Sequence, residues 1–167
     1  MHTLHYRIAT LAELPQIVDI YNSTIPSRMV TADMHPVSVE SRIPWFEAHL
    51  PDKWPLWLVS DEKGIIGWAS LQAFYDRPAY NATAEVSIYL NAEIRGMGLG
   101  SQVLRHCMDN CPLFGIHNLL GLIFSHNGPS LHMFKRAGFE EWGHLPKVAV
   151  LDGIERSVLI MGKRIGS

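Results

Sequence analysis

The chain has 167 residues, 47% of them hydrophobic, and a formal net charge of -2, which suits one globular domain with its own apolar core. This balanced charge, without a long run of one sign, argues against a nucleic-acid duplex or an anionic membrane as partner and favours a small ligand. The N-terminal residues lack the apolar segment of a secretory signal, and no window approaches a membrane span, so we expect a cytoplasmic protein.

The N-terminal part predicts a strand, a helix, a long loop and a second helix. Residues 6–9 form the strand, and a Thr10/Glu13 capping box starts a helix that ends near residue 22. The loop over 23–36 is long for a compact domain, so we expect it to form a wall of a substrate site. Ser38 caps the second helix, which runs to residue 50, and Pro44 predicts a kink within it.

A hairpin and a third strand occupy the middle of the chain. Residues 56–60 and 65–72 flank a tight turn, and an aromatic-rich connection, 74–81, leads to a strand over 84–90. Alternation in that strand places Glu85 on one face with Ser87 and Tyr89. The apolar residues Ala84, Val86, Ile88 and Leu90 lie on the other face.

Glycines at alternate positions mark the stretch after this strand, Arg95-Gly96-Met97-Gly98-Leu99-Gly100-Ser101. A strand end, a glycine loop and a helix start, here expected at Ser101, leave several backbone N–H groups uncovered and pointing one way, which favours a phosphate group. A flexible loop that needs glycine only for its turn angles is the alternative. A nicotinamide dinucleotide does not fit, because the glycine spacing differs and the next strand offers no carboxylate at its end.

The C-terminal part predicts a strand over 119–124, a helix that starts at Asn127-Gly128-Pro129-Ser130, and then strands. The uninterrupted apolar run of the first strand indicates cover on both faces. Short strands over 139–142 and 147–151 precede an Asp152-Gly153 hairpin turn. Helices among the earlier strands and a terminal hairpin predict a mixed sheet of the α/β or α+β class.

Metal and disulfide chemistry have little support in the sequence. Cys107 and Cys111 lie four apart on one expected helix, where neither disulfide geometry nor a metal clamp is available, so we interpret them as core or groove residues. The nine histidines are scattered singly, and we expect no metal.

Taken together, these motifs resemble the GNAT-fold N-acetyltransferases over essentially the whole chain. The family resemblance lies in Ile88-Tyr89-Leu90, Arg95, Gly98, Gly100, Asn127, Ser130 and Ala137-Gly138-Phe139. It is greatest to the phosphinothricin and methionine sulfoximine acetyltransferase branch, which shares Thr83-Ala84-Glu85, Tyr89, Gly98-Leu99-Gly100-Ser101, Asn127, Pro129-Ser130 and Gly138-Phe139.

The resemblance implies acetyl-coenzyme A in a cleft between the strands that end at Leu90 and Phe124. Its pyrophosphate would lie on the backbone N–H groups from Gly96 to Ser101, in agreement with the anion site, and Arg95 is expected on the same cofactor side. Its pantetheine arm would run beside Ile88, Tyr89 and Leu90, with Asn127 and Ser130 on the same cofactor side. The family also implies Glu85 as the base that deprotonates the acceptor amine, backbone N–H groups near Tyr89 and Leu90 as oxyanion donors, and a homodimer.

Two departures from the family concern the leaving group and the acceptor. Phe134 stands where relatives carry a tyrosine or histidine acid, so the thiolate would take its proton from water. Arg28 replaces an acid in the loop after the first helix and favours an acceptor carboxylate, or is simply solvated. We expect Arg28, Tyr75, Arg77 and Tyr80 to line the acceptor side.

The acceptor predicted from the resemblance is a small amine, such as an amino acid or a toxic analogue of one. Acetylation of a protein or peptide amine is an alternative. A non-catalytic module that binds acyl-coenzyme A is the alternative from a different class.

Overall fold

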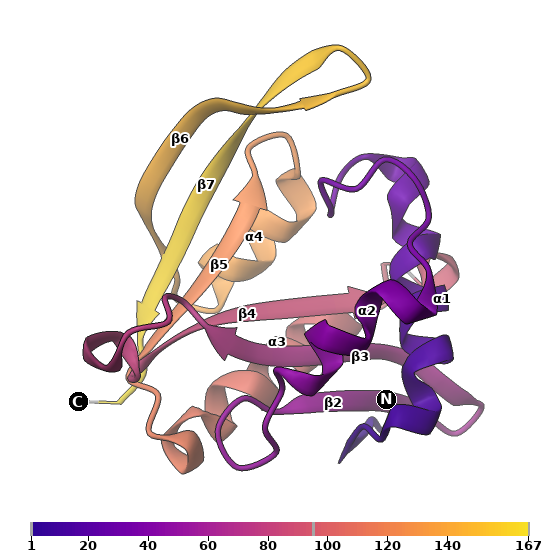
Figure 1. Cartoon of the computed structure of the whole chain (residues 1–167). Helices are drawn as coiled ribbons and strands as arrows, with labels where there is room; N and C mark the ends of the chain where they lie inside the picture. The colour runs from indigo at the N-terminus through magenta and orange to yellow at the C-terminus, as the bar shows by residue number, and fades with distance from the viewer. Residues whose placement is uncertain (1, 95, 167) are drawn as a thin grey trace.

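A seven-stranded mixed sheet organises the fold, and helices cover both of its faces (Figure 1). The structure is a computed structural model that describes residues 2–94 and 96–166. The strand order is β1-β2-β3-β4-β5-β7-β6, and every neighbouring pair is antiparallel except β4 and β5. The elements are β1 (His5–Ile8), α1 (Leu14–Thr24), α2 (Val39–Glu47), β2 (Leu56–Asp61), β3 (Gly64–Ala73), β4 (Thr83–Leu90), α3 (Leu99–Asn110), β5 (Asn118–Phe124), α4 (Gly128–Arg136), β6 (Glu140–Leu151) and β7 (Ile154–Arg164).

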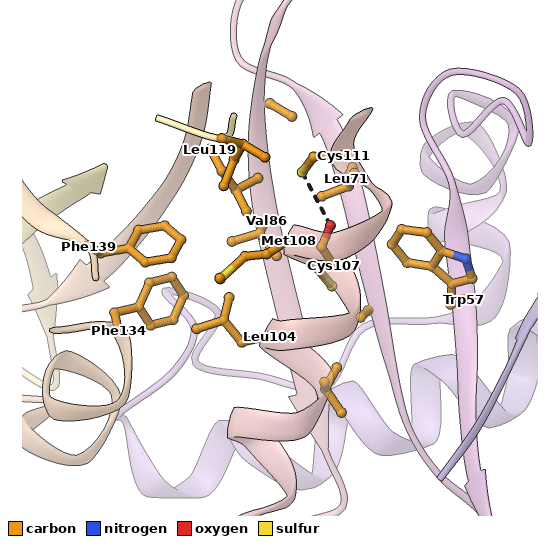
Figure 2. Packing of buried hydrophobic residues seen from close by; sticks show 14 of the residues in the cluster. Trp57, Leu71, Val86, Leu104, Cys107, Met108, Cys111, Leu119, Phe134 and Phe139 are labelled. Carbon is orange, nitrogen blue, oxygen red and sulfur yellow. Dashed lines mark hydrogen bonds between the residues drawn. The ribbon is translucent and has the colours of Figure 1, made fainter. Parts of the chain in front are cut away.

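Alternation along the strands supplies two cores, one on each side of the sheet. On β2, Leu56 and Leu58 join the cluster under α1 and α2, whereas Trp57 and Val59 join the cluster under α3 and α4. Figure 2 shows the second cluster, in which α3 packs between Trp57 and the aromatic ring of Phe134. The predicted mixed sheet of α/β or α+β type is therefore confirmed.

The two cysteines belong to this second core. Cys107 and Cys111 are free thiols with no exposed surface, and the Cys111 thiol donates a hydrogen bond of 3.2 Å to the Cys107 carbonyl (Figure 2). Burial raises the pKa of the Cys111 thiol to about 12, so it stays protonated. The interpretation of both as core residues is confirmed.

The start of the first helix differs from the prediction by one turn. The Thr10 N–H donates to the Glu13 carboxylate at 2.8 Å, as a capping box requires, but the turn from Leu11 to Glu13 is a 3-10 helix. The α-helix begins only at Leu14. On α2, the Ser38 hydroxyl accepts the Ser41 N–H at 3.2 Å, which confirms the predicted cap.

Two predicted element boundaries and one predicted burial were wrong. The two short strands after Phe139 are one strand, β6, whose pairing with β7 shifts register twice and whose Lys147 has a φ of 52°. Because the bulges interrupt the alternation of side chains along the strand, the sequence pattern did not show that the strand is continuous. α3 begins at Leu99 rather than Ser101, and Leu122 on β5 is 46% exposed although the strand was expected to be covered on both faces.

The parallel pair β4 and β5 stays together over a short distance only. Pairing joins Thr83, Ala84 and Glu85 to Asn118, Leu119 and Leu120 and then stops. β4 nevertheless continues to Leu90, paired with β3, while β5 continues to Phe124, paired with β7. The two strands diverge in Figure 1, and the part of β4 after Glu85 is a sheet edge.

Phe134 occupies the space that a side chain on β5 would need. Its ring packs against Phe139 at a centroid distance of 4.8 Å, and a Cβ added at Gly121 would lie 2.5 Å from its Cε1 atom. Within the described residues, no helix is long and apolar enough to cross a membrane.

We predict that Gly121→Ala destabilises the fold by roughly 1–3 kcal/mol, because the new methyl group would overpack against the Phe134 ring. Urea unfolding measures the change. Gly128→Ala is the matched control, since a Cβ there has no atom within 4 Å and the backbone has no positive φ. Equal stability of the two variants would contradict the predicted overpacking.

Candidate active site

A cavity of about 270 Å³ lies between α1, α2 and the face of β4 that carries Glu85, Ser87 and Tyr89. The predicted alternation on β4 is thereby confirmed, because Ala84 and Val86 are in the core on the opposite side. The lining residues are Ile17, Val18, Tyr21, Val37, Arg42, Trp45, Trp68, Gln72, Glu85, Ser87 and Tyr89.

Glu85 is the acidic group of this lining. Its carboxylate accepts a hydrogen bond of 3.2 Å from the side-chain amide of Gln72, the residue opposite it on β3. Burial raises the pKa of the Glu85 carboxyl, and the Gln72 contact opposes this only in part. A carboxylate whose pKa is raised toward neutrality is a stronger base than an exposed one and remains available to accept a proton.

Aromatic rings form the wall beside Glu85. Tyr89 stacks on Trp68 at a centroid distance of 4.6 Å and an interplanar angle of 20°, and Trp45 contacts Trp68 edge-on at 5.2 Å. The ring centroids of Tyr21 and Tyr89 are 5.0 Å apart. Burial raises the pKa of Tyr89, so its phenol is a neutral hydrogen-bond donor. The wall combines aromatic ring faces with placed polar groups, as in small-molecule sites.

A network that reaches this cavity through Arg42 and Tyr21 was missed in the sequence. Arg42 on α2 donates from Nη2 to the Asp33 carboxylate at 2.9 Å, and its guanidinium lies 4.8 Å above the Tyr21 ring. The Tyr21 hydroxyl donates to the same carboxylate and contacts Thr31. The sign of this network in the sequence was Arg42 itself, a charged residue three positions after Val39 among apolar residues at helical spacing.

Arg28 lies outside this cavity. Its Nε donates to the Asp152 carboxylate at 2.8 Å, and Asp152 stands at the turn between β6 and β7. The Arg28 guanidinium lowers the pKa of Asp152 through this hydrogen bond. The pair lines a second cavity of about 370 Å³ together with Asn22, Ile25, Pro26, Met34 and Pro36.

Tyr75, Arg77 and Tyr80, also expected on the acceptor side, form an exposed group on the connection from β3 to β4. The rings of Tyr75 and Tyr80 are 5.6 Å apart, and the Arg77 guanidinium lies 5.7 Å from the Tyr75 ring. None of the three lines the cavity beside Glu85. Their assignment to the acceptor stays a prediction.

The glycine loop has the backbone that the sequence predicted for an anion site. Gly96 and Gly98 have φ values of +84° and +72°, and a Cβ at either position would meet no atom within 4 Å. Gly98 is the N-cap of α3, so the free N–H groups of the 12-residue helix start at Leu99. Arg95 lies outside the described residues. Met97 is 49% exposed, and Ser101 is exposed on the first turn.

The edge of β4 from Val86 to Leu90 faces the gap that β5 leaves. The side chains of Ile88 and Leu90 pack on the core, so the backbone of this segment is the part that faces the gap. Such an edge offers unpaired N–H and C=O groups to an extended ligand. The glycine loop follows this edge in the chain, after the 3-10 turn Ala92–Ile94.

Asn127 and Phe134 are on the far side of the gap. The buried Asn127 side chain accepts the Ser130 N–H at 3.2 Å and donates to the Met29 carbonyl at 3.1 Å. It thus caps α4 and holds the loop that follows α1. Phe134 is 6% exposed and carries no group that could move a proton. Within residues 2–94 and 96–166, no three His, Cys, Asp or Glu side chains gather as a metal site.

The comparisons with known proteins agree with the family resemblance in the sequence. A model of the acetyltransferase (GNAT) family matches residues 15–139. The chain is 46% identical to YwnH of Bacillus subtilis over 160 residues, which are 95% of this chain and 98% of that protein. It is 32% identical to the L-methionine sulfoximine/L-methionine sulfone acetyltransferase of Pseudomonas aeruginosa over 143 residues, 85% of this chain and 83% of that protein.

A solved structure agrees as well. The GNAT superfamily phosphinothricin acetyltransferase of Sinorhizobium meliloti, in complex with AcCoA, has a TM-score of 0.90 and 28% sequence identity. The match covers 98% of this chain and 89% of that chain.

We predict that Glu85→Gln raises the thermal midpoint at neutral pH and that this gain fades toward pH 4. Because burial raises the pKa of Glu85 in the folded state, its contribution to stability is present below its unfolded pKa of about 4.3 and is lost as the pH rises through the folded pKa. Because the glutamine side chain carries no charge, the Glu85→Gln variant does not lose this stability as the pH rises. Thermal unfolding from pH 4 to 8 measures it.

Glu13→Gln is the matched control with the opposite sign. The Arg7 guanidinium lowers the pKa of Glu13, so the stability from this carboxylate is present above its unfolded pKa and is lost as the pH falls. Glu13→Gln therefore lowers the midpoint at neutral pH. Parallel pH profiles for the two variants would contradict the burial of Glu85.

Proposed function

The chain belongs to the acetyltransferase (GNAT) family and is an acetyl-coenzyme A dependent N-acetyltransferase, and we propose that its acceptor is the amino group of a small amino-acid-like molecule. The observation that carries this proposal is the position of Glu85. It is the last residue of β4 paired to β5, and its side chain lines the aromatic cavity. A proton acceptor therefore stands where the acceptor cavity meets the start of the splayed edge.

The described residues fit coenzyme A. The open glycines Gly96 and Gly98 and the N-terminus of α3 suit the pyrophosphate, with Met97, Leu99, Gly100 and Ser101 in the same cradle. The backbone of Ile88, Tyr89 and Leu90 suits the amide-containing pantetheine arm as an added strand. Asn127 and Ser130 border the gap from the α4 side. Arg95 remains a sequence-based assignment to this site.

The chemistry required of the chain is proton transfer and charge stabilisation. When bound, acetyl-coenzyme A supplies the acetyl group as an activated thioester. Glu85 accepts the proton of the acceptor ammonium, directly or through water, and frees the nitrogen lone pair. The backbone N–H groups near Tyr89 and Leu90 suit the developing negative charge on the acetyl oxygen. As the C–N bond forms and the C–S bond breaks, the nitrogen would lose its second proton to water, and the leaving thiolate would take a proton from water, because Phe134 has none to give.

The size and walls of the cavity favour a small acceptor over a protein chain. Tyr21 and Trp45 enclose it from α1 and α2, and Trp68 encloses it from β3. Relatives are named for methionine sulfoximine, methionine sulfone and phosphinothricin, all amino acid analogues. We propose acceptors of this class. The assignment of Arg28, Tyr75, Arg77 and Tyr80 to the acceptor side is kept as a proposal from the sequence.

We predict that Glu85→Gln lowers kcat by about 10²–10⁴-fold at pH 7.5 and leaves acetyl-coenzyme A binding unchanged, because it removes only the base. Release of the coenzyme A thiol measures turnover with methionine sulfoximine, methionine sulfone and phosphinothricin as acceptors. Isothermal titration measures cofactor binding. Full activity of the variant would remove Glu85 from the mechanism, and absence of turnover by the wild type with a broad amine panel would overturn the proposed function.

We also propose a homodimer and, from the sequence, a cytoplasmic location. The dimer is supported by apolar side chains left exposed on the last three strands, among them Trp142, Val148, Val150 and Ile154 at 45–56% exposure. β6 is the edge strand of the sheet, so a second copy could cover this surface and the edge together.

We predict that the wild type sediments as a dimer and that the double variant Val150→Lys/Ile154→Lys shifts it toward monomer, because lysines resist burial in an apolar interface. Analytical ultracentrifugation measures the mass. Leu113→Lys is the control, since Leu113 is 77% exposed outside this surface. A monomeric wild type, or a dimer insensitive to the double variant, would contradict the assignment.

A further inference from the structure

Arg42 is the cationic side chain in the lining of the acceptor cavity. It shares the cavity with the Glu85 carboxylate, and the other lining side chains are neutral. The half-buried guanidinium has 27% side-chain exposure, so it is shielded from bulk solvent without being closed off. A shielded guanidinium beside a neutral aromatic wall attracts an anion more strongly than one on the open surface.

The guanidinium of Arg42 is held in place before any acceptor binds. Asp33 fixes one nitrogen through the 2.9 Å contact to Nη2, and the Tyr21 ring supports the guanidinium plane at 4.8 Å. Tyr21 in turn donates its hydroxyl to Asp33. These contacts come from α1, the loop and α2, so three segments set one orientation and little side-chain entropy is left to lose on binding.

The contrast with Arg28 shows which arginine has more donors to spare. The Nε and Nη2 atoms of Arg28 donate to Asp152 at 2.8 and 3.4 Å, and its Nη1 donates to the Ile25 carbonyl at 2.9 Å. Three of its five N–H groups, one on each nitrogen, are therefore used within the protein. Among the residues that the structure describes, only Nη2 of Arg42 has an acceptor, and neither Nε nor Nη1 is among the fully buried atoms without a partner. These two nitrogens are accessible donors.

We propose that Arg42 is a specificity-determining residue that binds the carboxylate of the acceptor while Glu85 receives the proton of its amine. The proposal rests on the proposed function and names the acceptor class more closely, as amines that carry a carboxylate. The planar fork of an arginine matches a carboxylate, and charge-assisted hydrogen bonds of this kind are roughly twice as strong as neutral ones. Asp33 and Tyr21 are then positioning residues.

The test compares two acceptors that differ in one charge, L-methionine sulfone and its carboxamide, by thiol release from acetyl-coenzyme A. For the wild type we expect kcat/KM to favour the carboxylate. Arg42→Gln should reduce this preference by about 10–100-fold, chiefly through a higher KM for the carboxylate, with the carboxamide nearly unaffected. Arg42→Lys should restore part of the preference, because it keeps the charge and loses the fork. Comparing ratios between enzymes cancels the different amine pKa values of the two acceptors.

The outcomes separate this inference from a structural role and from the proposed function. Two outcomes would show that Arg42 only holds the loop and would overturn the inference. One is an equal loss of activity with both acceptors in Arg42→Gln. The other is a lower thermal midpoint in Arg42→Gln that Arg42→Lys restores together with both activities. Loss of the preference in Arg28→Gln with its retention in Arg42→Gln would also overturn the inference. A wild type that acetylates both acceptors equally overturns the inference while the proposed function stands. A wild type that acetylates no amine overturns the proposed function itself.

Discussion

The early end of the pairing between β4 and β5 is the constraint on which the candidate site depends. Parallel strands are normally buried and paired along their length, so an edge in mid-sheet exposes backbone groups that need partners. Here Glu85 and Leu120 are the last paired residues. The divergence leaves the later half of β4 available to a ligand strand and places the glycine loop at the end of that edge. Each strand is still stabilised on its other side, by β3 and by β7, so the fold tolerates the opening.

The same geometry explains why a carboxylate stands where burial disfavours its charge. Glu85 faces aromatic side chains and, among the described residues, accepts one side-chain hydrogen bond, from Gln72. More donors would stabilise the carboxylate, lower its pKa and weaken it as a base. Burial with one donor instead raises its pKa, so the residue proposed for proton transfer destabilises the free protein when it is charged. Phe134 has the opposite character, because its ring fills the space over Gly121 and contributes packing without any proton chemistry.

Local pattern sufficed for the parts of the fold that depend on short-range spacing. The capping residues Thr10 and Ser38, the alternation around Glu85 and the open backbone of Gly98 follow from period, caps and glycine position. The continuity of β6 could not be predicted in this way, because the bulges interrupt the alternation of side chains along the strand. Nor could the exposure of Leu122, since an apolar run indicates burial but cannot tell which of its residues lose their neighbours where the sheet opens.

The acceptor side was less predictable because it is assembled from segments that are distant in the chain. In the sequence, Arg28 stood out as a cation in a loop of expected function, but the structure ties it to Asp152, 124 residues away. Nothing local to Arg28 reveals that partner. Arg42 was inconspicuous on an amphipathic helix, yet folding brings it to the cavity through Asp33 and Tyr21. The position of a charged residue in the chain therefore indicates its role less well than the number of its hydrogen-bond donors that are already bonded within the protein. By that criterion Arg28, which donates three N–H groups to Asp152 and Ile25, links the loop to the hairpin, and Arg42 keeps more donors for a substrate.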